Sequence, residues 1–352
     1  MPDYDGSNRA ASDRTSFEIV RDSPPAGLDQ AWRKCLQDVD FATHYTTPEY
    51  FREPFFRSKQ PFAVLGLIGQ DVVAVCTGIH DGQWLRCGLS ERPQVAIARG
   101  ADLDSVAAGL AAGLREESRS SKLADVFSWS QLNGMRHCGF NEREEQGTIV
   151  LDLSLGADAL FRSFSQTRRT DIRNAIKAGV TVDLAGSSAD ILEAYAVYNE
   201  WTARKGLSPV PRESYVEAVS LASNRRLFVA RHQGKMVANL IVRFAPGGIM
   251  EAAAIVALEE QFYLHPNDLL HFRAIEWACG EGLRLYSLGA SHLFARRFGG
   301  SLFPTYRYRL DRTFLKHHTI RDAASGLMQI GAAYAPSSLV GFARRLRHQS
   351  RS

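Results

Sequence analysis

The chain has 352 residues, of which 45% are hydrophobic and 23% are charged, and its formal net charge is +4. This length exceeds that of a typical domain with one hydrophobic core, and it predicts two domains of ordinary size. The composition is that of a folded protein and excludes a low-complexity or collagen-like chain. A basic excess this small does not by itself indicate a nucleic-acid partner.

The five cysteines are scattered, odd in number and contain no CxxC pair. This pattern disfavours a disulfide framework and a zinc knuckle, and it fits a reducing compartment. The first sixteen residues are polar and lack the apolar stretch of a signal peptide. No apolar run approaches the length of about twenty residues that a membrane-spanning helix needs. We therefore expect a cytoplasmic protein.

Residues 1–16 are predicted to be a disordered lead. The first half then follows the order strand, two helices, three strands, helix and two strands. Glycine in Gly69-Gln70-Asp71 and in Asp81-Gly82 indicates the hairpin turns between the three central strands. The predicted ranges are Phe17–Arg21, Leu28–Val39, Pro48–Lys59, Pro61–Ile68, Val72–His80, the residues after Gly82, Leu103–Glu117, Ala124–Trp129 and Thr148–Leu153.

The second half is predicted to repeat this order after an extra helical segment, Asp158–Ala178. Its strands are expected at Val180–Leu184, Leu227–Arg231, Met236–Phe244, Ile249–Val256, Arg284–Leu288 and Tyr306–Leu310. Its helices are expected at Ala189–Lys205, Arg212–Ala222 and Leu269–Glu281.

The two halves align without a gap through their hairpins. When Phe62 is aligned with Leu227, Gly69 aligns with Gly234 and Gly82 aligns with Gly247. Two unrelated domains with the same turn chemistry would also need glycine at these turns. Agreement in element order, spacing and the following helix favours an internal duplication.

Four tracts of the second half together resemble one family. They are FRSFSQTRRTDIRNAIKAGVTV from Phe161, LFVARHQGKMVANLIVRF from Leu227, HPNDLLHFRAIEWACGEGLRLYSLGAS from His265, and FARRFGGSLFPTYRYRL from Phe294. In this order they resemble the acyltransferases of the GNAT superfamily, of the FemAB-like and CelD-like kind.

The resemblance implies a mixed α/β fold of tandem GNAT-like domains, the N-terminal copy being degenerate. We expect a lead over 1–16, an N-terminal GNAT-like domain over 17–153, a C-terminal acyltransferase domain over 154–325 and a basic tail over 326–352. Ser287 departs from the family, which shows aspartate there, and Arg296 and Arg297 stand in its lysine region. The phosphate-cradling loop of ordinary GNAT enzymes is replaced by ALEEQFYLHPND after Val256.

The resemblance also implies where a site lies. Two neighbouring parallel strands, Ile249–Val256 and Arg284–Leu288, are expected to diverge and admit a donor. A helix starting near His265 would attract anions through its free N–H groups, although ordinary capping also explains Asn267. Asn239 and Ser287 are further substrate- or donor-binding candidates. Glu251 is the candidate general base, with a half-buried edge carboxylate as the alternative.

Basic residues supply the remaining candidates. Arg169, Arg173 and Lys177 are four apart and share one helix face, which is either a solvated surface or a clamp for a phosphate-rich group. Arg296 and Arg297 are expected to bind the donor. Alternating Arg307, Tyr308 and Arg309 predict a strand with one basic face, where tyrosines that stack on bases keep RNA open as a partner.

The leading hypothesis is direct transfer of an acyl group, with acetyl expected, from acyl-CoA to an amine or hydroxyl in polysaccharide or cell-envelope metabolism. The alternatives are an aminoacyl-tRNA-dependent transferase acting on a cell-wall precursor and a non-catalytic binding module. Histidine spacing gives no metal signal, so no metal is expected. The basic tail, together with its apolar residues, favours either simple docking or peripheral contact with the inner membrane face and a lipid- or glycan-linked acceptor.

Overall fold

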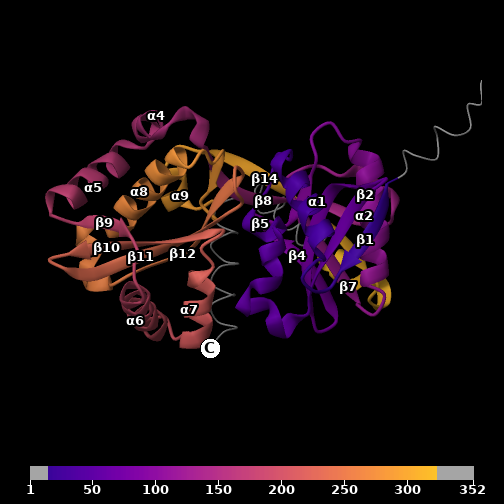
Figure 1. Cartoon of the computed structure of the whole chain (residues 1–352), viewed down its shortest axis with the longest axis horizontal. Helices are drawn as coiled ribbons and strands as arrows, with labels where there is room; N and C mark the ends of the chain where they lie inside the picture. Colours follow the sequence, from indigo (N-terminus) through magenta and orange to yellow (C-terminus); the bar gives the residue numbers. More distant parts are fainter. Residues whose placement is uncertain (1–14, 323–352) are drawn as a thin grey trace, which may run out of the picture.

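The computed structural model describes residues 15–322. Their strands form a 14-stranded mixed sheet in the order β1-β2-β3-β4-β7-β14-β8-β13-β12-β11-β10-β9, with β5 paired to β4 and β6 to β3. The sheet runs through two lobes, and helices cover both of its faces in each (Figure 1).

The N-terminal lobe packs helices on both faces because alternate side chains of its strands point to opposite sides. Phe62 and Val64 pack towards α2, whereas Ala63 and Leu65 pack towards α1. Its helices are α1 (Ala26–Gln37), α2 (Leu103–Glu117) and α3 (Asn133–His137). Its strands are β1 (Ser16–Val20), β2 (Pro61–Ile68), β3 (Asp71–Asp81), β4 (Trp84–Leu89), β5 (Arg92–Pro93), β6 (Val95–Ile97), β7 (Leu123–Ser128) and β8 (Asn141–Asp152).

The C-terminal lobe places α5 and α8 against one face of its sheet and α6 and α7 against the other. Its helices are α4 (Ala157–Ser163), α5 (Gln166–Lys177), α6 (Ser188–Arg204), α7 (Arg212–Ser220), α8 (Pro266–Gly280) and α9 (Leu293–Arg296). Its strands are β9 (Thr181–Leu184), β10 (Arg225–His232), β11 (Lys235–Phe244), β12 (Ile249–Ala257), β13 (Leu285–Ser287) and β14 (Ser301–Asp311).

The second lobe repeats the first, as the hairpin alignment predicts. β1, α1, β2, β3, β4, α2, β7, α3 and β8 correspond in order to β9, α6, β10, β11, β12, α8, β13, α9 and β14. The turns of both hairpins contain glycine in the left-handed region, with φ of 62° at Gly69 and 79° at Gly234. Each lobe also has one parallel strand pair, β4 with β7 and β12 with β13.

The last strand of each repeat crosses into the other lobe. β14 leaves the C-terminal lobe and pairs with β7 through Tyr306–Asp311. β8 leaves the N-terminal lobe, and its end, Val150–Asp152, pairs with β13. The two exchanged strands also pair with each other, which makes the sheet continuous between the lobes (Figure 1).

Three sequence predictions are corrected by the structure. The helix expected over Pro48–Lys59 consists of two 3₁₀ helices, Pro48–Arg52 and Pro54–Lys59. Pro54 is the physical reason, because proline holds the preceding residue, Glu53, in an extended conformation. β8 and β14 begin earlier than expected, at Asn141 and Ser301. The first half of β8 is polar and pairs with the basic strand β14, so it lacks the apolar alternation of an ordinary strand.

No helix within residues 15–322 is long and apolar enough to cross a membrane.

Candidate active site

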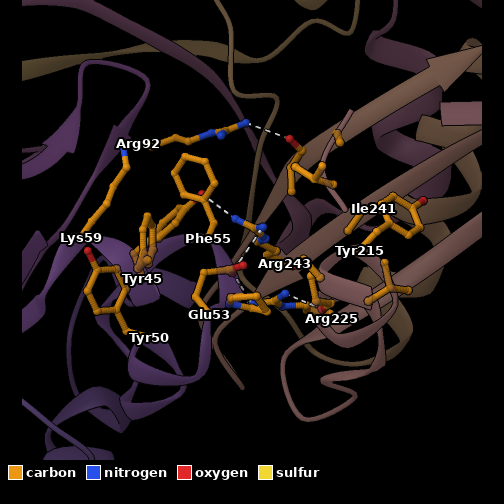
Figure 2. A pocket seen from close by; sticks show the side chains of 18 of the residues that line it. Tyr45, Tyr50, Glu53, Phe55, Lys59, Arg92, Tyr215, Arg225, Ile241 and Arg243 are labelled. Carbon is orange, nitrogen blue, oxygen red and sulfur yellow. Dashed lines mark hydrogen bonds and ion pairs between the residues drawn. The ribbon is translucent and has the colours of Figure 1, made fainter. Parts of the chain in front are cut away.

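A cavity of about 550 Å³ lies between the two lobes (Figure 2). The N-terminal lobe lines it with its 3₁₀ helices and with β4 and β5, and the C-terminal lobe lines it with α7, β11 and β12. Aromatic rings form much of the wall, namely Tyr45, Tyr50, Phe55, Phe56, Tyr198 and Tyr215. Its size, position and lining are typical of a small-molecule site at a domain interface.

Positive side chains dominate the charge of this cavity. Five cations line it, namely Lys59, Arg86, Arg92, Arg225 and Arg243, and Glu53 is the lone acid among the lining residues of the described chain. Such a lining favours a ligand with negative charge, because a partly enclosed cleft concentrates the field of its charges.

Glu53 links the two lobes through buried ion pairs. Its Oε2 accepts a hydrogen bond from Arg225 Nη2 at 2.5 Å and lies 3.3 Å from Arg243 Nη2 (Figure 2). Burial alone would raise the pKa of Glu53, but the hydrogen bond with His44 and the charges of the two arginines outweigh burial and lower that pKa to about 2. Glu53 is therefore ionised, and it fixes the 3₁₀ segment of one lobe to β10 and β11 of the other.

The parallel strands β12 and β13 diverge on the cavity side. They pair only through Ile249–Glu251 and Leu285–Ser287. Beyond this point β12 continues along β11 to Ala257, whereas the chain after β13 follows β8, with Leu288 N donating to Ile149 O. An opening therefore lies between the carboxyl ends of the two strands, as the sequence predicts.

Glu251 lies at the last paired position before this opening. Its side chain is buried, opposite Arg243 on β11 and beside Ser287 on β13. Within residues 15–322, neither carboxylate oxygen has a hydrogen-bond partner. Burial raises the pKa of Glu251 to about 7, although the charges of Arg92 and Arg243 oppose the shift. Such a carboxylate can accept a proton near neutral pH.

Arg92 extends from β5 of the N-terminal lobe into the opening. Its Nη2 lies 3.0 Å from Ala253 O and 3.5 Å from Ala252 O, both on β12 (Figure 2). Gly289, just after β13, is close to both groups, because a Cβ added there would lie 3.2 Å from Ala252 O and 3.8 Å from Arg92 Nη2. Residues 15–322 provide Arg92 with no acidic partner.

The start of α8 lies at the same ends of the strands. The helix begins at Pro266 after His265, whose φ is 52°, and no side chain caps it. This confirms the helix start expected near His265. Asp268, in the first turn, forms a buried ion pair with Arg168, and His265 Nδ1 lies 3.8 Å from Asp171. The charges at this helix start are therefore already partly balanced.

The predicted basic candidates form two groups near this helix start. Arg169 is half-buried and Arg173 and Lys177 are exposed on α5, while Arg296 and Arg297 are exposed on and just after α9. Ser165 N donates to Arg297 O at 2.9 Å, which joins the start of α5 to the end of α9. Within the described chain none of these five side chains has an acidic partner, so their expected role in donor binding stays a prediction.

The other predicted polar candidates lie elsewhere. Asn239 lines the cavity, and its Nδ2 donates to Ala194 O at 3.3 Å. Ser287 is buried at the opening, where its Oγ accepts a hydrogen bond from Gly289 N at 3.3 Å. Asn267 is half-buried in the first turn of α8, and its Oδ1 has no partner. The candidates therefore divide between the cavity with its opening and the helix start behind it.

One group of side chains has metal-ligand chemistry that the sequence spacing did not indicate. Ligand atoms of Asp171, His265 and Asp268 lie within 4.8 Å of one another. Arg168 already pairs with Asp268, so a metal ion would compete with a buried guanidinium. The absence of a metal stays a prediction.

The basic face expected on the last strand is engaged within the protein. Arg309 forms two hydrogen bonds of 2.6 Å with Asp125, and Arg307 pairs with Glu145 and Asp322. Tyr308 is fully buried, and its hydroxyl accepts a hydrogen bond from Leu132 N. The interpretation that Tyr308 stacks on bases is therefore wrong, because the ring has no exposed face.

Sequence reasoning missed Glu53, Arg92 and Arg168. Glu53 and Arg92 belong to the copy expected to be degenerate, and no motif marks them. Arg168 is the buried arginine of its helix, over the rings of Phe294 and Phe298, although its neighbour Arg169 fits the stripe better. The apolar positions Ile172 and Ala175 could have identified Arg168 as a residue of the inward face, since they follow it by four and seven residues.

Residues 162–294 match the family described as the acetyltransferase (GNAT) domain. This part of the C-terminal lobe is therefore similar to a GNAT acetyltransferase domain. The match spans α5, the β10–β11 hairpin, the opening and the first half of α9, and it contains all of the candidate residues except Arg296 and Arg297. None of the curated proteins matches the chain.

Several solved structures share the fold. FemX is 12% identical with a TM-score of 0.62, and the alignment covers 80% of this chain and 95% of FemX. L-PGS from Bacillus licheniformis is 13% identical with a TM-score of 0.56, covering 86% and 96%. A tandem GNAT protein from the clavulanic acid biosynthesis pathway is 13% identical with a TM-score of 0.51, covering 85% and 99%.

These likenesses concern the fold, because sequence identity is low. They confirm the expected mixed α/β fold of two tandem GNAT-like domains. The FemAB-like resemblance fits the FemX structure, and the CelD-like part stays a prediction.

Proposed function

We propose that this protein is an acyltransferase that moves an acyl group, with acetyl expected, from acyl-CoA to an amine or hydroxyl of an acceptor held between the lobes. The observation that carries the proposal is the opening between β12 and β13, with the unpaired, buried Glu251 at its base. The cavity supplies a place for the acceptor. The helix start and the cations of α5 and α9, which have no acidic partner within the described chain, supply a place for the donor's phosphates.

The proposed reaction is a direct transfer. The acceptor nitrogen or oxygen attacks the carbonyl carbon of the donor, a new bond forms to that carbon, and the carbon–sulfur bond breaks. The proton of the acceptor passes to the Glu251 carboxylate, directly or through one water, and the CoA thiolate leaves. Burial of Glu251 serves this step, because a raised pKa makes the carboxylate a better base near neutral pH.

Acetyl-CoA offered with a panel of amines and alcohols tests the proposal, with released CoA measured by a thiol reagent. Glu251→Gln should lower kcat about 10²- to 10⁴-fold, the usual contribution of a general base. Glu259→Gln is the matched control, because Glu259 is exposed just beyond the end of the same strand and pairs with Arg204. No turnover by the wild-type protein would contradict the proposal, and equal loss in both variants would exclude Glu251 as the base.

A second candidate is transfer from an aminoacyl-tRNA to a cell-wall precursor. Phe262 and Tyr263, both exposed shortly before α8, could stack on bases. Salt-sensitive tRNA binding without any response to acetyl-CoA would favour this candidate.

The remaining alternative is a binding module without catalysis, which Ser287 favours because it replaces the family's aspartate. Binding of acetyl-CoA without turnover across the acceptor panel would support it.

A cell-envelope role, a cytoplasmic location and peripheral contact with the inner membrane face are part of the proposal. Similarity in fold to the C-terminal domain of a putative lysylphosphatidylglycerol synthetase from Agrobacterium fabrum supports the envelope role, and a lipid- or glycan-linked acceptor with it. The basic tail over 326–352 lies outside the described residues. Cell fractionation with and without 1 M salt would test the location, because salt releases a protein held by charge.

A further inference from the structure

We propose that Arg92 is a catalytic residue that the N-terminal lobe contributes to the opening of the C-terminal lobe, where it binds the oxygen of the donor's acyl carbonyl. This inference rests on the proposed acyl transfer and adds to it a second catalytic group. It also gives a function to the copy that has no opening of its own.

The position of Arg92 carries the proposal. Its guanidinium is anchored on β12 through Ala252 O and Ala253 O, one and two residues beyond Glu251. It also lies close to Gly289, which follows β13, so it stands where the two strands begin to part. An acyl group that reaches Glu251 between the two strands must therefore pass beside this guanidinium.

The unused hydrogen-bonding capacity of Arg92 points the same way. A guanidinium has five N–H donors, and in residues 15–322 only Nη2 of Arg92 has hydrogen-bond partners. No carboxylate of the described chain pairs with it, unlike Arg225 and Arg243, which share Glu53. Arg92 also lines the cavity that the proposal assigns to the acceptor.

The chemistry needs a positive charge at this place. When the acceptor attacks, the electron pair of the carbonyl π bond moves onto the oxygen, which becomes negative. When the carbon–sulfur bond breaks, the pair returns and the thiolate leaves with the negative charge. A hydrogen-bond donor that is already in place at this oxygen stabilises the intermediate without having to reorganise. Loss of one such hydrogen-bond donor typically slows turnover 10²- to 10³-fold.

Turnover of acetyl-CoA with hydroxylamine as a small acceptor tests the proposal, with the hydroxamate product measured. Arg92→Ala should lower kcat about 100-fold or more with KM for acetyl-CoA changed less than threefold. Arg92→Lys should keep part of the rate, and added guanidinium ion should restore part of the rate of Arg92→Ala. The control is Arg119→Ala, an exposed arginine of the same lobe whose side chain is 79% accessible.

The pH profile provides a second readout that a purely structural role would not move. The charge of Arg92 opposes the rise in the pKa of Glu251, and so does that of Arg243 on β11, opposite the glutamate. Removal of Arg92 should therefore shift the acid limb of kcat to higher pH.

The outcomes separate the two proposals. Absence of turnover in the wild-type protein contradicts the proposed function and this inference with it. Wild-type turnover with an unchanged kcat in Arg92→Ala contradicts only the role of Arg92. A rise in KM alone would also overturn it, because that would make Arg92 a binding group for the ground state. Urea unfolding of each variant shows whether a rate loss merely reflects loss of fold.

Discussion

The two copies differ most at their parallel strand pairs. In the N-terminal lobe β4 leaves β7 after Cys87, and residues 88–97 turn back into the gap. There β5 pairs with β4, β6 pairs with β3, and Gln94 N donates to Phe127 O. In the C-terminal lobe β12 stays on β11 to its end and the gap remains. One copy therefore closes its opening with its own chain, and the segment that closes it contains Arg92.

The buried carboxylates at these gaps differ in the same way. The register places Arg86 beside Asp125 in the N-terminal lobe and Glu251 beside Ser287 in the C-terminal lobe. Asp125 is held by Arg309 through two hydrogen bonds, whereas Glu251 has none. A paired carboxylate stabilises a fold, and an unpaired one costs stability but remains free to take a proton.

The largest expected effect comes from the contact between the copies. Glu53→Gln should lower the free energy of unfolding by about 3–5 kcal/mol, because Arg225 and Arg243 would keep buried charges without an anion. Urea unfolding measures the loss. The matched control is Glu217→Gln, whose exposed ion pair with Arg57 should contribute at most about 1 kcal/mol. Equal small losses would mean that the lobes do not depend on this ion pair.

The unpaired carboxylate should make stability depend on pH. Glu251 has a folded pKa of about 7, above its ordinary value of 4.5, so the folded state binds this proton more tightly than the unfolded state. The stability that this proton binding provides is fully present below about pH 4.5 and is lost as the pH rises through about 7. The free energy of unfolding should fall by up to about 3 kcal/mol over this range. Urea unfolding of the wild type and of Glu251→Gln should show this as a changing difference between the two. A difference that stays constant from pH 5 to 8 would contradict the burial of an unpaired Glu251.

Opening the closed gap should cost less. Gly88 has a φ of 94°, and a Cβ there would lie 2.7 Å from Arg92 O, so Gly88→Ala should destabilise the fold by about 2 kcal/mol. Gly247→Ala, at a φ of 65° in open space, should cost about 1 kcal/mol. Thermal unfolding compares the two variants. Equal losses of stability would show that the β4–β5 turn accommodates the added methyl group by a small shift of its backbone.

The smallest effect concerns the short helices that correspond in the two copies. Arg296→Ala and Arg297→Ala should each weaken acetyl-CoA binding about fivefold, or about 1 kcal/mol, with stability unchanged, because these exposed cations have no acidic partner in the described chain. Arg136→Ala in α3, the N-terminal counterpart of α9, should leave binding unchanged. Calorimetric titration with acetyl-CoA distinguishes them, and equal affinities for all three variants would remove α9 from the donor site.

Much of the fold could be predicted from local signals. The hairpin glycines, the alternating strands and the helix start at Pro266 are encoded within a few residues of themselves, so the duplication was visible. The strand exchange was not, because the partner of β14 is set by contacts between residues far apart in sequence, such as Tyr308 with Leu132. The helix expected over Pro48–Lys59 shows a different limit of prediction. There a single proline, Pro54, interrupts a segment whose other residues have a helical pattern.

The site was predictable only in part. Glu251, Asn239 and Ser287 are candidates through the family resemblance, and their roles stay predictions. Asn239 lines the cavity, and Glu251 and Ser287 are paired where β12 and β13 part. Glu53 and Arg92 were not found, because a charged residue in a short helical or turn segment looks like a surface residue. The role of each depends on its contacts with the other lobe, and a local sequence pattern does not encode those contacts.

The strand exchange also sets the order in which the two lobes can be completed during synthesis. The N-terminal lobe emerges first from the ribosome, but the place beside β7 is filled only by β14, which begins at Ser301. Until that strand is made, β7 has an unpaired edge that could associate with another nascent chain. The first lobe to be translated is therefore the last to be completed, and a ribosome that stops before Ser301 leaves the edge of β7 unpaired.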